Sequence, residues 1–150
     1  MSKSGRYSAD RKKIEALSAS KTVEVADCGT IFTLNEDAGL TTVTLPLIAS
    51  AGNGWWCRFV LGSLSGGTNT DITIASNASD VDKVYGNVVN SMPLAAAPHI
   101  SGSNFAGVDG VKFDTSACAI GDVVEFYTDA SNWYVEGITS GSAAIIKHDA

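Results

Sequence analysis

Apolar and polar residues alternate along short stretches of this chain, most clearly over residues 121–137. Val124 and Phe126 occupy alternate positions, and the same period resumes at Trp133 and Val135 after four turn-forming residues. A period of two on both sides of a polar turn indicates two strands joined as a β-hairpin. The segment therefore predicts a β fold, and it carries no set of catalytic residues.

Further segments with strand character follow one another from residue 21 onward, separated by turns rich in Gly, Asn and Ser. The expected strands span residues 22–25, 30–34, 42–45, 56–61, 72–75, 83–85, 111–113, 123–127, 133–138 and 143–147. Many short strands with little helix predict an all-β fold, a jelly-roll-like β-sandwich or barrel. Residues 88–110 include Pro93 and Pro98, and we expect them to form a long loop.

The alternation also indicates which side chains face the core. The expected core residues are Phe32, Leu34, Val43, Leu45, Cys57, Phe59, Leu61, Ile72, Ile74, Val124, Phe126, Trp133 and Val135. Trp55 and Trp56 are adjacent, so within a strand they would point to opposite faces. One of them therefore lies at the end of the sandwich or in a subunit interface, where Trp is enriched. Only 17% of the residues are charged, which favours the interface.

The first 21 residues differ from the rest in charge. They carry six basic and two acidic residues, a balance of +4, whereas residues 22–150 carry four basic and 14 acidic residues, a balance of −10. Ser8 could cap a helix over residues 8–17 in which Ile14 and Leu17 share a face. We therefore expect a basic N-terminal arm, residues 1–21, ordered only when docked, followed by a single β domain, residues 22–150.

No residues converge on a catalytic or metal-binding pattern. The two histidines, His99 and His148, lie far apart in sequence, and the three cysteines form no C-x-x-C pair. Cys28, Cys57 and Cys118 are expected to be small buried hydrophobic residues. The pair Asp80 and Asp82 is expected to be a turn with solvated carboxylates. We expect neither a metal nor another cofactor.

The overall composition restricts the partners. The acidic body would repel phosphate, so nucleic acid is not an expected partner. No stretch approaches 18 apolar residues and residues 1–7 contain no apolar core of a signal peptide, so we expect no membrane span and synthesis in a cytoplasm. Partners are therefore expected to be proteins, with host surface glycans as a further possibility because several aromatic residues are available.

Several ordered motifs resemble those of a known class of proteins. They are Phe32-Thr33-Leu34-Asn35, Val43-Thr44-Leu45-Pro46, Gly121-Asp122-Val123 and Asn132-Trp133-Tyr134-Val135. This set is similar to small β-rich structural proteins of tailed bacteriophages, namely capsid decoration (cement) and head-fibre-like proteins. The resemblance covers residues 21–61 and 110–147. In the hairpin turn this chain has Ala130-Ser131, where such proteins often have glycine.

The resemblance implies a homotrimeric, non-enzymatic virion protein that binds the outer capsid surface and stabilises contacts between major capsid proteins. The arm would be the capsid anchor, through Lys3, Arg6, Tyr7, Arg11, Lys12, Lys13, Ile14 and Leu17. The oligomer interface would include Trp55, Trp56, Tyr127 and Tyr134. The alternative is a fibre-tip or receptor-binding module whose exposed aromatic residues contact host glycans, and an enzyme is the third class considered.

Overall fold

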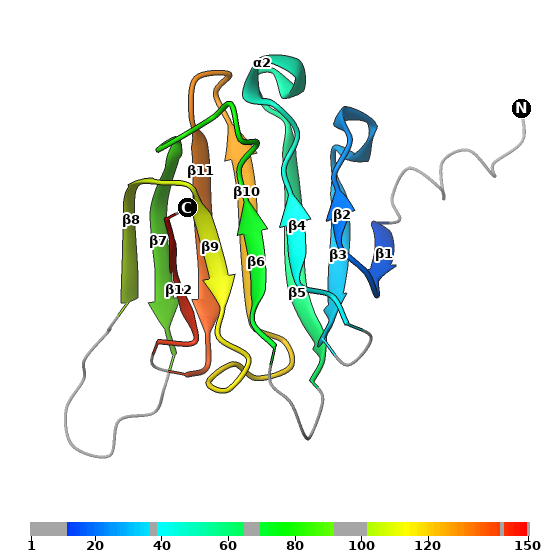
Figure 1. The fold of residues 1–150 in the computed structure, drawn as a ribbon, viewed down its shortest axis with the longest axis vertical. Helices are drawn as coiled ribbons and strands as arrows, with labels where there is room; N and C mark the ends of the chain where they lie inside the picture. The colour runs from blue at the N-terminus through cyan, green and yellow to red at the C-terminus, as the bar shows by residue number, and fades with distance from the viewer. Residues whose placement is uncertain (1–11, 37–38, 65–69, 92–101, 142, 150) are drawn as a thin grey trace, which may run out of the picture.

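The protein is a sandwich of two β-sheets, as a computed structural model shows (Figure 1). The structure describes residues 12–36, 39–64, 70–91, 102–141 and 143–149. Buried side chains from both sheets form one continuous hydrophobic core. The predicted all-β fold with two packed layers is confirmed.

The larger sheet has seven strands and the smaller sheet has five. In spatial order, the larger sheet contains β1 (Lys13–Leu17), β3 (Thr30–Asn35), β5 (Trp56–Ser63), β10 (Val123–Thr128), β11 (Trp133–Thr139), β7 (Val84–Asn90) and β8 (Gly102–Val108). The smaller sheet contains β12 (Ile145–His148), β9 (Gly110–Phe113), β6 (Ile72–Ala75), β4 (Thr42–Thr44) and β2 (Lys21–Thr22). Within the described residues, a 3-10 turn η1 (Val25–Asp27) and a short helix α2 (Ile48–Ala51) lie between strands.

The predicted hairpin and core are both confirmed. Strands β10 and β11 pair antiparallel, with Phe126 opposite Val135 and Tyr127 opposite Tyr134. All 13 expected core residues are fully buried. Phe32 stacks on Phe59 with ring centroids 5.4 Å apart, so aromatic contacts join neighbouring strands within the core.

Two predictions of local structure are wrong. Residues 13–17 of the expected helix form strand β1, which pairs parallel with β3, while residues 8–11 lie outside the described residues. The expected loop over residues 88–110 contains the end of β7 and all of β8, which pair antiparallel, while residues 92–101 lie outside the described residues. In both cases pairing with another strand of the larger sheet overrides the local preference.

The jelly-roll connectivity is not confirmed. Five of the ten strand pairs among the described residues are parallel, including β3 with β5 and β11 with β7. Parallel pairing requires crossover connections, and here these crossovers run between the two sheets. The expected domain boundary at residue 21 also shifts, because β1 already belongs to the larger sheet.

One glycine is required for the larger sheet to form. Gly86, in the middle of β7, has a φ of 145° and pairs with Val135 of β11. A Cβ atom at this position would lie 1.9 Å from the Val135 carbonyl oxygen. Only glycine therefore allows β7 to lie beside β11, which completes the surface described next.

Candidate functional site

The outer face of the seven-stranded sheet, which points away from the five-stranded sheet, carries an aromatic row. The strand registers place Trp56 opposite Tyr127, Tyr127 opposite Tyr134 and Tyr134 opposite Tyr85. These four residues lie on four adjacent strands, and they point outward because their sequence neighbours are buried. The rings of Tyr127 and Tyr134 stack with centroids 5.5 Å apart and planes 27° apart.

Two residues further along each strand lies a polar row. Arg58, Glu125, Glu136 and Asn87 follow one another across β5, β10, β11 and β7. The Arg58 guanidinium donates to Glu125 Oε2 through Nε at 2.9 Å and Nη2 at 2.5 Å. Arg58 and Glu125 are therefore paired with each other, and Asn87 accepts a hydrogen bond from Asn104 of β8 at 2.9 Å.

The polar and aromatic rows are joined by a hydrogen bond. The Tyr127 hydroxyl donates to Glu136 Oε1 at 2.8 Å. This hydrogen bond, together with burial and the nearby negative charge, raises the pKa of Tyr127 above its ordinary value. The Tyr127 ring is thereby held in a fixed orientation on the sheet surface.

An apolar row lies on the other side of the polar row. Val60, Val123, Ile138 and Val89 are successive partners across β5, β10, β11 and β7. Ile138 is 56% exposed and Val89 is 41% exposed. A depression of about 680 Å³ extends over the three rows, and its lining includes Arg58, Glu125, Tyr127, Tyr134, Glu136 and Ile138.

The turn of the β10–β11 hairpin is organised by one carboxylate. Asp129 accepts hydrogen bonds from the backbone N–H groups of Ser131 and Asn132, both at 2.8 Å, and from the Tyr134 hydroxyl at 2.9 Å. The two backbone donors, and then the Tyr134 hydroxyl, lower the pKa of Asp129. The turn therefore fixes the second tyrosine of the aromatic row.

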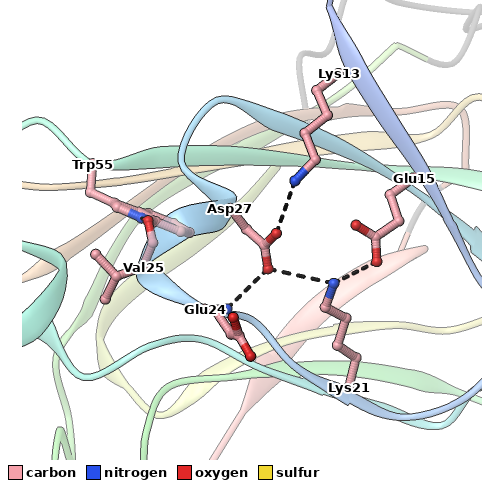
Figure 2. A network of polar contacts seen from close by, with 7 residues as sticks. All are labelled: Lys13, Glu15, Lys21, Glu24, Val25, Asp27 and Trp55. Carbon is pink, nitrogen blue, oxygen red and sulfur yellow. Dashed lines mark hydrogen bonds and ion pairs between the residues drawn. The ribbon is translucent and has the colours of Figure 1, made fainter.

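A separate polar network lies where the chain enters the described structure (Figure 2). Asp27 pairs with Lys13 of β1 at 3.1 Å and with Lys21 of β2 at 3.4 Å, and Lys21 pairs with Glu15 of β1 at 2.5 Å. The Lys21 ammonium also lies 5.0 Å from the centroid of the Phe32 ring. The network therefore joins edge strand β1 of the larger sheet to β2 of the smaller sheet.

The charges in this network stabilise one another. Burial disfavours the charged form of Asp27, but the Glu24 backbone N–H and the two lysines outweigh it, and the pKa of Asp27 is lowered. Burial likewise disfavours charge on Lys21, but Glu15 and Asp27 outweigh it, and the pKa of Lys21 is raised. Asp27 and Lys21 are therefore held in their ionised forms near neutral pH.

The predicted interface residues divide into two groups. Trp56, Tyr127 and Tyr134 come together in the aromatic row, as described above. Trp55 is only 3% exposed, packs edge-on against Trp133 and donates from Nε1 to the Val25 carbonyl oxygen at 2.9 Å. Placing Trp55 in an interface is therefore wrong. Trp55 lies two residues before Cys57, so the alternation of β5 continues to it and directs its side chain inward.

The predicted anchor residues also divide. Lys3, Arg6, Tyr7 and Arg11 lie outside the described residues. Lys12 and Ile14 are exposed, whereas Lys13 belongs to the network with Asp27. Leu17 is 4% exposed and contributes to the core, so an anchoring role for Leu17 is wrong.

Two smaller expectations are also wrong. Cys28 is exposed because it ends the η1 turn, although Cys57 and Cys118 are buried as expected. Asp80 is 8% exposed rather than solvated, and its Oδ2 accepts a hydrogen bond from the backbone N–H of Ile48 at 2.9 Å. Asp80 therefore anchors the start of α2.

Sequence reasoning did not identify the polar and apolar rows, and it did not assign Tyr85 to the interface. The alternation in β10 and β11 could have indicated that Glu125, Glu136 and Ile138 point outward. Their alignment with Arg58 and Val89 depends on strand register, which no local pattern encodes.

Within the described residues, no group of three or more His, Cys, Asp or Glu side chains is placed to hold a metal ion. The same residues include no helix that is long and apolar enough to cross a membrane. Comparison with protein-family models, curated proteins and solved structures found no match to this chain. Its function must therefore be inferred from its own geometry.

Proposed function

We propose that this protein is a non-enzymatic virion structural protein, a homotrimeric decoration protein on the outer surface of a bacteriophage capsid. It would be made in the host cytoplasm and would bind neighbouring major capsid proteins, stabilising the contacts between them. The observation that supports this proposal best is the attachment of strand β1. The network around Asp27 fixes the point from which the basic N-terminal residues leave the domain.

Because β1 belongs to the folded domain, the proposed anchor is shortened to residues 1–12. These residues carry four basic side chains and one acidic side chain, a balance of +3, ahead of an acidic body. Twelve residues in extended form reach at most about 40 Å. A charged segment of this reach, tied to a rigid domain, suits binding to an acidic surface on an adjacent capsid protein.

The test compares binding to undecorated capsids built from the major capsid protein of the same phage. One variant lacks residues 2–12 and keeps β1 intact. A second keeps the full length but replaces Lys3, Arg6, Arg11 and Lys12 with Ser. Co-sedimentation should show loss of binding for both variants, and wild-type binding should weaken as salt is raised.

Two outcomes would contradict this function. If the variant lacking residues 2–12 bound capsids as well as wild type does, residues 1–12 would not be the anchor. Failure of the wild-type protein to bind capsids at low salt would remove the decoration role itself. Circular dichroism of each variant, compared with wild type, would confirm that the β-sandwich is intact.

A further inference from the structure

The two outer faces of the sandwich differ in chemistry. The outer face of the five-stranded sheet is formed mainly by small polar side chains, namely those of Thr22, Thr42, Thr44 and Thr73. Seven large hydrophobic residues in the described part of the chain are exposed, and four of them, Ile14, Tyr85, Val89 and Ile138, lie on the outer face of the seven-stranded sheet. Concentrated apolar exposure on one face marks an interaction surface.

The polar groups in the middle of the seven-stranded face already have partners within one copy of the chain. Arg58 is paired with Glu125, and Tyr127 is hydrogen-bonded to Glu136, all within one copy of the chain. Covering the Arg58–Glu125 pair isolates neither of its charges, and the Glu136 carboxylate keeps the Tyr127 hydroxyl as a hydrogen-bond partner. The polar row lies between the aromatic and apolar rows, so a partner could contact both of these rows at once.

The size of the face is sufficient for a specific interface. Seven strands about 4.8 Å apart and five residues per strand at about 3.3 Å give a face of about 34 Å by 17 Å, or about 570 Å². Three such faces turned toward a three-fold axis bury about 1,700 Å² in total, shared among three contacts, and this sum lies in the range of specific protein–protein interfaces. Two further copies of the chain therefore offer enough surface of matching composition.

We infer that the outer face of the seven-stranded sheet is the surface through which copies of this chain associate. This inference rests on the homotrimer of the proposed function and names the surface that forms it. Three copies related by a three-fold axis would turn these faces toward the axis, with the aromatic and apolar rows at the contacts. The threonine-rich face of the smaller sheet would remain exposed to solvent.

The experiment measures the mass of the purified full-length chain by light scattering after size-exclusion chromatography. The wild-type protein should have a mass of about 46 kDa, three times the 15.5 kDa of one chain. Ile138→Lys places a charge in the apolar row at a position that is 56% exposed, so the isolated domain should accommodate it. This variant should have the mass of one chain.

A matched control and a second variant make the result specific. Thr44→Lys places the same charge on the outer face of the five-stranded sheet and should leave the wild-type mass unchanged. Val89→Lys changes a neighbouring strand in the apolar row and should reproduce the effect of Ile138→Lys. Circular dichroism and thermal unfolding of each variant would identify a loss of mass caused by unfolding.

Several results would overturn the inference. One is a wild-type protein that is monomeric at about 100 µM, a concentration well above the micromolar range of modest protein affinities. Another is that the Ile138→Lys and Val89→Lys variants fold and keep the wild-type mass. A glycan array on which wild type binds and Tyr127→Ala does not, with an unchanged mass, would assign the face to receptor binding instead.

Capsid binding by the monomeric variant tests the trimer surface and the decoration role separately. Monomeric Ile138→Lys keeps residues 1–12, so it should bind capsids more weakly than wild type through loss of multivalency, without losing binding entirely. A wild-type trimer that requires this face but binds no capsid would support the inference and contradict the decoration role.

Discussion

Replacing Asp122 with Ala should be among the most destabilising single changes in this protein. Asp122 precedes β10 and is only 4% exposed. Its carboxylate accepts four hydrogen bonds: from the Ala119 N–H at 3.0 Å, the Thr139 hydroxyl at 2.9 Å, and the Ser140 N–H and hydroxyl at 2.8 and 2.9 Å. It therefore ties the start of β10 to the end of β11.

The size of the effect follows from these contacts. A hydrogen bond to a charged group contributes about 1.5–3 kcal/mol, and each buried donor left unpaired costs about 1–3 kcal/mol. The two hydroxyls can rotate toward other acceptors, but the two backbone N–H groups cannot. We therefore expect Asp122→Ala to lower the free energy of unfolding by about 3–5 kcal/mol, a large share of the roughly 5–15 kcal/mol typical of a domain.

Urea unfolding, followed by tryptophan fluorescence and circular dichroism, measures this loss as a fall in the midpoint at constant slope. Asp129→Ala is the matched control, because Asp129 accepts three hydrogen bonds in the same hairpin but is exposed. Its loss should be much smaller, since water can replace the carboxylate as a partner. Equal losses for the two variants would refute the idea that burial sets the cost.

Four further predictions concern other sites. Gly86→Ala should prevent β7 from pairing with β11 and yield insoluble or unfolded protein, measured as soluble yield and circular dichroism. Ala130→Gly should raise the midpoint of urea unfolding by relieving a φ of 70°, a gain of about 0.5–1 kcal/mol. Because the pKa of Asp27 is lowered in the folded state, this carboxylate stabilises the fold at pH values above its unfolded pKa of about 3.9. That stabilisation is lost as pH falls through the folded pKa. The free energy of unfolding of Asp27→Asn should therefore fall less upon acidification than that of wild type. Cys28 alone should react with a thiol reagent in the native state, because burial protects the other two cysteines and raises their pKa; all three should react in urea.

The hairpin and the core could be predicted from sequence because strict alternation between buried and outward positions identifies both the strand and its inner face. The β10–β11 hairpin needs only a short turn, so its partner strand is also local. The alternation therefore predicts Phe126 and Trp133 as core residues, and both are fully buried.

Strand β1 could not be predicted in this way. Ile14 and Leu17 are three residues apart, which suits one face of a helix, but in the strand Ile14 points outward and Leu17 points inward. Pairing with β3 decides between helix and strand, and this pairing cannot be read from the sequence of residues 8–17 alone. The exposed Ile14 side chain is acceptable in an edge strand.

The candidate surface depends still more on distant pairing. Glu125 and Arg58 are 67 residues apart in sequence, and their contact requires the β5–β10 register. Outward-facing residues can be listed from the alternation in each strand, whereas the rows that they form across strands cannot. Sequence therefore identified three members of the aromatic row without showing that they form a continuous surface with Tyr85.

The wide separation of paired strands has a consequence for synthesis on the ribosome. Strand β5 ends at Ser63, but its partner β10 begins only at Val123, about 60 residues later. At a synthesis rate of roughly 5–20 residues per second, one edge of β5 stays unpaired for about 3–12 s before β10 is made. During that interval its backbone hydrogen-bonding groups can pair with other nascent chains. The C-terminal hairpin is therefore the segment whose arrival ends the period of greatest aggregation risk.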